Sequence, residues 1–253
     1  MNIYLAATSN VKNAFLDGNI DASKVNVLES FYSIQPWQIE FLPKFKNFLL
    51  DSGAFTFLNQ KKSQKIEFNK YADEYAEFIV KYNITKYFEL DIDSIVDLDE
   101  VEKIRERIER QTKIKSIPVW HKNRGKQYFI DMCKNYPYVS LGGIALKEIQ
   151  ISIFEKMFPW FINTAHYYNC KIHGLGFTQI NKLPLYHFDS VDSTTWINGQ
   201  RFGELHQFID NKIIIHRSVK NGIKYRVLKE PYRINVHNFN EWVKFSQYAD
   251  KKL

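Results

Sequence analysis

The sequence contains few cysteines and no long apolar run. Its 253 residues include two cysteines, Cys133 and Cys170, and neither belongs to a CxxC pair. This spacing argues against a cysteine-based zinc site, and two thiols in a chain of this size indicate a reducing compartment. No apolar run approaches the ~20 residues of a membrane helix, and the opening residues MNIYLAATSN are too short and too polar for a signal peptide. We therefore expect a soluble, cytoplasmic protein with no metal, no cofactor and no membrane partner.

Low-complexity tracts, long linkers and obvious repeats are also absent from the sequence. Hydrophobic residues make up 45% of the chain, which excludes a disordered protein. The length is typical of one α/β barrel, so we predict a single domain over residues 1–253. The net charge of +7 favours a polyanionic partner such as nucleic acid, with a basic solvated surface as the alternative.

Short apolar runs alternate with amphipathic stretches along most of the chain. Residues 68–82, 98–110 and 149–168 have the apolar spacing of helices. Strand and helix in alternation predict a parallel sheet covered by helices. The number of runs approaches eight and favours a closed (β/α)8 barrel of the TIM type, with an open doubly wound sheet as the alternative. The apolar runs are Ile3–Ala7, Phe48–Asp51, Tyr87–Asp93, Ile117–His121, Tyr138–Gly143, Lys171–Phe177 and Phe188–Asp192.

The chain after Trp196 fits this alternation less well. Residues 212–216 predict a strand and residues 240–248 a closing helix. Between them, residues 216–229 predict a basic hairpin that turns at Asn221-Gly222. We expect this hairpin to contact nucleic-acid phosphates, although an ordinary charged ribbon has the same composition. Its candidate contacts are Arg217, Lys220, Lys224 and Arg226.

Polar residues and glycines end most of the apolar runs. In parallel α/β folds the active site lies at the carboxyl ends of the strands. Carboxylates beside glycines suit a planar heterocycle that approaches the backbone closely. Each residue alone also has a structural interpretation: Asp51 could cap a helix, and Asp97, Asp99 and Glu100 are expected as charges of a first helical turn. The end residues are Asp51-Ser52-Gly53, Asp91, Asp93, His121, Gly142-Gly143, Gly174, Gly176, Asp189 and Asp192.

Several of these segments resemble those of the tRNA-guanine transglycosylases and their DNA-modifying relatives. Residues 142–148 (GGIALKE) resemble that family's GGLAVGE segment, and residues 51–55 (DSGAF) resemble its DSGGFQ segment. Residues 173–177 (HGLGF) resemble its HLLGVG strand, and residues 188–193 (FDSVDS) resemble the strand that carries a nucleophilic aspartate. The similarities follow the family's order from residue 51 to about residue 195.

The resemblance implies a TIM barrel in which Asp192 is the nucleophile and Asp51 the proton-transfer group. Asp189 is the alternative nucleophile, because serine follows both aspartates. His121 falls where the family has a base-reading glutamine, and Asp91 or Asp93 falls where an aspartate reads the base. The implied substrate-binding residues are Ser52, Gly53, Phe55, Asp91, Asp93, His121, Gly142, Gly143, Gly174 and Gly176.

The chain also departs from the tRNA enzymes of that family. It lacks their zinc site of three cysteines and one histidine, and it is considerably shorter. It therefore looks more like the branch that places 7-deazaguanine bases in phage or bacterial DNA. The implied partners are DNA rather than tRNA and a free purine or 7-deazapurine base, in the cytoplasm of a bacterium or a phage-infected host.

The chemistry of base removal suits these residues. Breaking an N-glycosidic bond develops positive charge at C1′, which a nearby carboxylate stabilises and can attack, while a second carboxylate moves a proton of the base. Asp192 lies nearer the carboxyl end of its run than Asp189, and the two should face opposite ways. A base inside a duplex would first have to be flipped out. Two alternatives remain open: a DNA glycosylase that leaves an abasic site, and a non-catalytic nucleic-acid-binding or nucleotide-sensing barrel.

Overall fold

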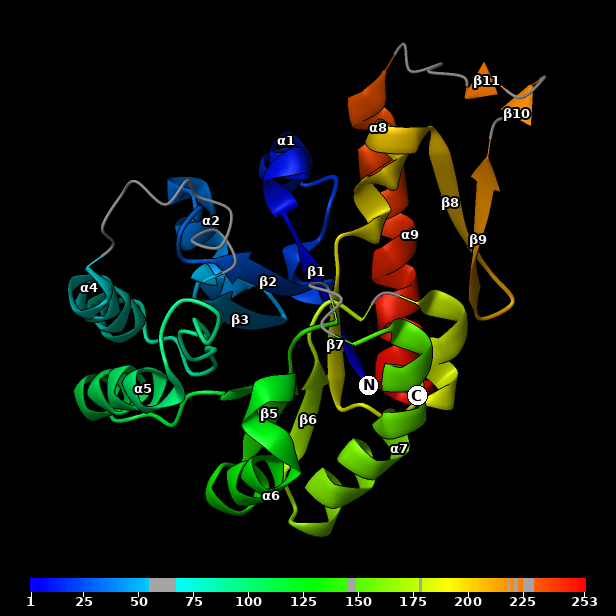
Figure 1. Ribbon diagram of the computed structural model, residues 1–253. Coiled ribbons are helices and arrows are strands. Elements are labelled where there is room, and N and C mark those ends of the chain that lie inside the picture. Colours follow the sequence, from blue (N-terminus) through cyan, green and yellow to red (C-terminus); the bar gives the residue numbers. More distant parts are fainter. Residues whose placement is uncertain (55–66, 145–148, 178, 218, 221–222, 225–229) are drawn as a thin grey trace. The chain divides into compact units, whose positions relative to one another are not determined.

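The protein has an α/β fold built on a parallel sheet. The computed structural model describes residues 1–54, 67–144, 149–177, 179–217, 219–220, 223–224 and 230–253 (Figure 1). Seven strands are hydrogen-bonded in the order β3-β2-β1-β7-β6-β5-β4. They are β1 (Asn2–Ala6), β2 (Asn26–Ser30), β3 (Asn47–Asp51), β4 (Val119–Trp120), β5 (Tyr138–Leu141), β6 (Lys171–Gly174) and β7 (Ser190–Ser193). The predicted parallel α/β sheet is thus confirmed, with seven strands rather than the eight of a complete (β/α)8 barrel.

The chain divides into two compact units. The first unit comprises residues 1–28, 41–47 and 176–253, and the second comprises residues 29–40 and 48–175. The first contains α1 (Lys12–Leu16), α8 (Asn198–Phe202), α9 (Pro231–Lys252) and the antiparallel pairs β8 (Glu204–Ile209) with β9 (Lys212–Arg217) and β10 (Val219–Lys220) with β11 (Ile223–Lys224). The second contains most of α2 (Pro36–Phe41) and all of α4 (Phe68–Lys81), α5 (Leu98–Thr112), α6 (Gly125–Asn135) and α7 (Ile151–Tyr167). No helix in the described ranges combines the length and the apolar character needed to cross a bilayer.

Parallel pairing in the second unit follows the predicted apolar runs. Val119 pairs with Ser140 in β4 and β5, and β6 continues the ladder beside β5. The run Tyr87–Asp93 forms only two isolated parallel bridges, from Tyr87 to Leu50 of β3 and from Phe88 to Ile117. Among the residues that the structure describes, the run therefore pairs with its neighbours only at Tyr87 and Phe88, and its polar end, with Asp91 and Asp93, forms no strand bridge.

An apolar cluster joins α4 and α5 to Leu50 of β3 and to the run Tyr87–Ile92. Tyr75 of α4 and Ile104 of α5 both belong to this cluster. The Tyr75 hydroxyl donates to the backbone oxygen of Phe88 at 3.0 Å. Both helices were predicted from their apolar spacing. Asp97 caps α5 by accepting from Glu100 N at 2.9 Å, and Asp99 and Glu100 occupy its first turn, as predicted.

The long helix α9 holds the first unit together. Its buried face contacts β1 and the segment around Trp196, whose indole Nε1 donates to the backbone oxygen of Ala6 at 3.1 Å. Phe239 of α9 lies with its ring centroid 4.9 Å from that of Trp196. The predicted closing helix, residues 240–248, is confirmed and extends further in both directions. The amino- and carboxyl-terminal segments of the chain thus share one core.

The β8–β9 hairpin is fastened to α9 by polar side chains. It turns at Asp210-Asn211, and both residues have positive φ (49° and 66°), as a tight two-residue hairpin turn requires. Asn238 accepts from His206 N at 2.8 Å, and Glu241 accepts from Phe208 N at 2.7 Å. These bonds satisfy donors along the β8 edge that would otherwise be buried unpaired.

His206 is a fully buried histidine at this contact. Trp242 Nε1, which can only donate, bonds to His206 Nδ1 at 2.8 Å, so the neutral ring carries its proton on Nε2. Nε2 lies 3.5 Å from Glu204 Oε2. Burial lowers the pKa of His206, and Glu204 opposes this shift without reversing it.

Acid should therefore weaken this contact. Because the folded pKa lies below that of an exposed histidine, the unfolded chain takes up the proton first, and the stabilisation is complete only above pH ~6.5. In a His206→Gln variant, the amide oxygen can accept from Trp242 but does not titrate. We expect the advantage of wild type over the variant in free energy of unfolding, measured with urea, to shrink between about pH 7.5 and about pH 5. A pH-independent difference would contradict this assignment.

Candidate active site

Asp51 ends β3 in the second unit, as predicted. Its Oδ2 accepts from Gly53 N at 3.0 Å, a local bond of the capping kind that the sequence also allowed. The Tyr71 hydroxyl donates to the backbone oxygen of Ser52 at 2.6 Å. Burial raises the pKa of Tyr71, and the Asp51 carboxylate raises it further. Asp51 is thus held in place as an acceptor next to a tyrosine that remains protonated.

The residues that follow Asp51 are closely packed. Gly53 has φ +83°, and a Cβ there would lie 2.7 Å from Tyr32 Cβ, so glycine is required. Ser52 is fully buried, and its hydroxyl has no hydrogen-bond partner among the described residues. Phe55, also expected at this site, lies outside the described residues. The unpaired hydroxyl of Ser52 is a polar group that a ligand could satisfy.

Asp91 and His121 lie together in the second unit. His121 Nε2 is 3.3 Å from Asp91 Oδ2. The His121 side chain is 7% exposed and the Asp91 side chain 16%. Burial raises the pKa of Asp91, and the hydrogen bond from His121 opposes this shift without cancelling it. The pair offers donor and acceptor atoms in a largely dry environment, where they are worth more than in water.

Asp93 has a different environment. Arg124 donates to both of its oxygens, from Nε at 2.7 Å and from Nη2 at 2.6 Å. Burial would raise the pKa of Asp93, but the Arg124 guanidinium outweighs burial and lowers it. The sequence left Asp91 and Asp93 as equal candidates for base recognition. The structure distinguishes them, because the carboxylate of Asp93 is already bound to an arginine.

Glu89 is a functional candidate that the sequence analysis missed. It is fully buried and accepts from Val119 N at 2.6 Å, from Arg124 Nη1 at 2.7 Å and from Arg105 Nη1 at 3.0 Å. Both of its oxygens are therefore used in an ion-pair network. The signal in the sequence was a charged residue inside the apolar run Tyr87–Ile92, which implies a buried partner.

Gly142 follows β5 and lies against His121. A Cβ on Gly142 would be 2.7 Å from His121 Cε1 and 2.7 Å from Val119 Cγ1. The sequence analysis expected this close approach to come from a flat ligand, whereas here the imidazole ring occupies the space. Gly143 has φ +75°, which suits a tight turn.

We expect Gly142→Ala to displace the His121 ring. The added methyl group overpacks a buried site, which typically costs about 1–3 kcal/mol, and the displacement should break the contact with Asp91. Urea unfolding measures the cost, and the matched background is His121→Ala, in which the ring is absent. The same cost in both backgrounds would show that the ring does not set the requirement for glycine.

Asp192 belongs to the first unit. It lies in β7, opposite Tyr4 of β1, and is 9% exposed. Its Oδ1 accepts from Gly176 N at 2.6 Å, and Gly176 has φ +72°. Gly176, predicted to bind substrate, thus orients the carboxylate, whereas Gly174 ends β6 in the second unit.

Asp189 precedes β7 at its amino end. Its backbone oxygen accepts from Asn2 N at 2.9 Å, at the first residue of β1. In parallel α/β folds the active site lies at the carboxyl ends of the strands. This position favours Asp192 over Asp189 as the candidate nucleophile.

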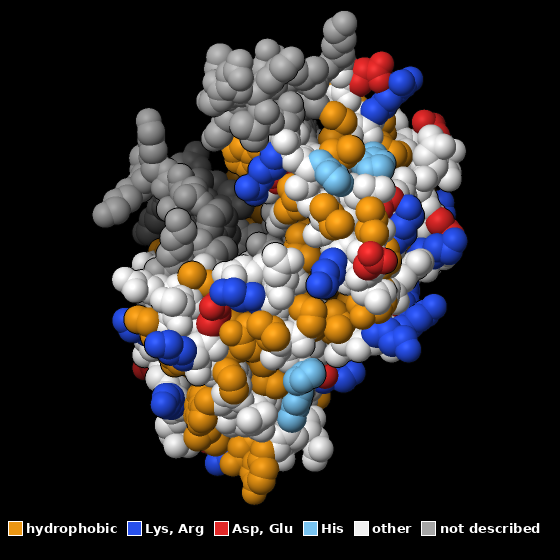
Figure 2. All heavy atoms as spheres, turned by 90° about the vertical axis from the view of Figure 1, so that its right-hand side faces the viewer, with side chains coloured by type: hydrophobic (Ala, Val, Ile, Leu, Met, Phe, Trp, Pro, Cys, Tyr) orange, Lys and Arg blue, Asp and Glu red, His pale blue; other side chains and the backbone are white. Residues whose placement is uncertain are grey.

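The predicted basic hairpin is described only in part. Strands β10 and β11 pair antiparallel, with Val219 opposite Lys224. Arg217, at the end of β9, donates from Nε to Glu204 Oε1 at 2.9 Å, although its side chain is 67% exposed. The side chains of Lys220 and Lys224, and the whole of Arg226, lie outside the described residues. Elsewhere on the face that Figure 2 turns to the viewer, Lys and Arg side chains stand in separate groups among hydrophobic ones.

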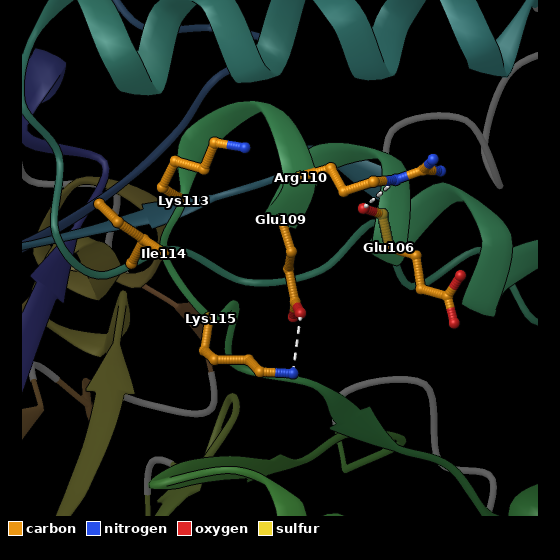
Figure 3. Close-up of a pocket in the computed structure, with 6 residues that line it drawn as sticks. All are labelled: Glu106, Glu109, Arg110, Lys113, Ile114 and Lys115. Atoms are coloured by element: carbon orange, nitrogen blue, oxygen red, sulfur yellow. Dashed lines mark hydrogen bonds and ion pairs between the residues drawn. The ribbon is translucent and has the colours of Figure 1, made fainter.

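A pocket of about 460 Å³ lies elsewhere in the second unit, at the carboxyl end of α5 (Figure 3). It is lined by Glu106, Glu109, Arg110, Lys113, Ile114 and Lys115. Lys115 pairs with Glu109 at 3.3 Å, and Glu109 also accepts from Ser116 N and Oγ. The pocket precedes β4 in the chain, away from the strand ends that carry Asp91 and His121, so its charged groups do not belong to the candidate site.

Within the described ranges, no cluster of three or more His, Cys, Asp or Glu side chains is placed to hold a metal ion. Each carboxylate of the candidate site contacts a nitrogen of the protein: Gly53 for Asp51, His121 for Asp91, Arg124 for Asp93 and Gly176 for Asp192. Compared with protein-family models, curated proteins and solved structures, the chain matches none.

Proposed function

We propose that the protein is a base transglycosylase that exchanges guanine for a 7-deazaguanine-type base in nucleic acid, with DNA favoured over tRNA. The observation that carries this proposal is the placement of carboxylates along parallel strands: Asp51 ends β3, Asp91 follows the Tyr87–Phe88 bridges, and Asp192 lies in β7. We further propose that these bridges are the remnant of an eighth strand that completes a (β/α)8 barrel.

In this mechanism Asp192 attacks C1′ of the target nucleoside. The C1′–N9 bond breaks as an ester bond forms between C1′ and the Asp192 carboxylate, and the departing base takes up a proton at N9. The incoming base loses its N9 proton and attacks C1′, which breaks the ester and frees the carboxylate. The bond from Gly176 N to Asp192 Oδ1 orients the attacking carboxylate.

Asp51 transfers the proton in both half-reactions. As an acid it protonates the departing base, and as a carboxylate it accepts the proton of the incoming base, so it returns to its starting state after one exchange. Asp91 and His121 hold the base, because their pair presents both a hydrogen-bond acceptor and a donor at the strand ends. Ser52 adds a hydroxyl that a bound base could pair.

An incorporation assay tests this function. The protein is incubated with radiolabelled guanine or 7-deazaguanine and with either DNA or tRNA, and the polymer is recovered and counted. Label in DNA supports the proposal. Abasic sites without label would indicate a glycosylase instead, and an intact, unlabelled polymer of both kinds would contradict both enzymatic functions.

We expect Asp51→Asn to retain the fold and to lose most of the activity in this assay. General acid–base groups contribute about 10²–10⁴-fold to rate, and the asparagine oxygen can still accept from Gly53 N. The variant should still bind the free base. If activity falls only a few-fold, Asp51 stabilises the local turn through its bond with Gly53 N and does not transfer the proton.

A further inference from the structure

Backbone hydrogen bonds fix the segment that carries Asp91 only at its beginning. Glu89 N donates to the backbone oxygen of Ile117 at 3.1 Å, which ties this residue to the neighbouring strand segment. Beyond it, the backbone bonds within the described part of this segment are local, such as Ile92 N to Leu90 O at 3.0 Å. Leu90 and Ile92 are buried in the apolar cluster, and side-chain bonds tie Asp91 and Asp93 to the chain that follows β4.

One short turn supplies both of those side-chain contacts. His121 and Arg124 lie at the two ends of a 3-10 turn after β4, and Arg124 N donates to the backbone oxygen of His121 at 3.0 Å. His121 reaches Asp91, and Arg124 reaches Asp93. Two residues of the turn thus bind two carboxylates that are two positions apart.

Arg124 also connects this contact to the sheet. While Nε and Nη2 bind Asp93, Nη1 donates to Glu89 Oε1, which in turn accepts from Val119 N of β4. The Arg124 and Glu89 side chains are fully buried, and that of Asp93 is 6% exposed. The planar fork of an arginine makes these three bonds from three separate nitrogens, whereas the three donors of lysine share one nitrogen and cannot reach the same positions.

We propose that Arg124 is a positioning residue for base recognition: by clamping Asp93 to Glu89, it holds Asp91 against His121 and so sets the affinity for the base. This proposal rests on the proposed function for the identity of the ligand. Arg124 acts through Asp91 and His121 and does not itself touch the base.

Arg124→Lys keeps the charge and removes the fork. We expect its Kd for free guanine, measured by calorimetry, to rise by about 10-fold, because a misplaced Asp91 loses about one hydrogen bond to the base, and about 1.4 kcal/mol is tenfold in Kd. In the exchange assay, the KM for the base should rise by a larger factor than kcat falls. The matched control is Arg107→Lys, since Arg107 makes a comparable two-bond pair with Asp73 (2.7 Å and 2.7 Å) on the surface of α5 and α4. It should leave guanine binding unchanged.

A second readout needs no ligand. In wild type, Asp91→Asn should shift the NMR signals of the His121 ring, because the two side chains touch. In the Arg124→Lys background the same substitution should shift them much less. If Arg124→Lys does not fold, Asp93→Asn, which removes the partner of the fork and preserves its size, replaces it in both experiments.

The two readouts separate the two proposals. Weaker guanine binding together with an uncoupled His121 supports the positioning role. Unchanged guanine binding, or a His121 signal that still responds fully to Asp91→Asn, would overturn it. If wild type binds neither guanine nor 7-deazaguanine while Arg124→Lys uncouples His121, the proposed function and its base affinity are wrong, but Arg124 still positions the pair.

Discussion

Asp192→Asn is expected to abolish base exchange, with a loss of roughly 10⁴–10⁶-fold, the scale seen when a nucleophile is removed. Asparagine has nearly the same shape, and its oxygen can still accept from Gly176 N. It cannot form the ester with C1′ or place a full negative charge beside it. The fold should therefore persist, with unchanged circular dichroism, while incorporation of labelled base disappears.

Asp189→Asn is the matched control for that experiment. It makes the same chemical change three residues earlier in the chain, at the amino end of β7. We expect it to retain near wild-type activity. The opposite outcome, an active Asp192→Asn and an inactive Asp189→Asn, would exchange the roles of the two aspartates.

The second large effect is expected at Glu89. Replacing it with glutamine removes the charge that faces Arg105 and Arg124 and turns an amide donor toward one of these donors. Removing one partner of a buried ion pair typically costs about 3–5 kcal/mol, and small domains have only about 5–15 kcal/mol of stability. Glu89→Gln should therefore unfold at far lower urea concentration than wild type.

The control for Glu89 is an exposed carboxylate with a similar partner. Asp73 accepts two bonds from Arg107, but its side chain is 35% exposed. Surface ion pairs contribute little because water screens them, so Asp73→Asn should shift the urea midpoint only slightly. Equal shifts for the two variants would show that the Glu89 network does not support the fold.

The sequence predicted those strands and helices whose position is determined by the burial of apolar side chains. Apolar runs became strands because buried parallel strands are nearly continuously apolar, and the spacing in α4 and α5 placed Tyr75 and Ile104 in one cluster. The strand Asn26–Ser30 was missed, because three of its five residues are polar. The helix Gly125–Asn135 was also missed, although Phe129, Met132 and Cys133 form its buried face.

The candidate site was predictable only in part. Strand ends identified Asp51, Asp91 and His121, because residue order along a parallel strand determines which end a side chain occupies. The difference between Asp91 and Asp93 could not be predicted, because it depends on Arg124, about thirty residues later in the chain. Gly142 was expected to face a ligand but faces His121, a contact between two strand ends that no local pattern encodes.

The most direct test of the nucleophile is to trap the ester. Without an incoming base, wild-type protein and a guanine-containing DNA or RNA should form a covalent complex that survives a denaturing gel, and mass spectrometry of the digested complex should place the nucleoside on the peptide that contains Asp192. The Asp192→Asn variant should form no such complex. A complex attached elsewhere, or base exchange without any covalent complex, would contradict the mechanism.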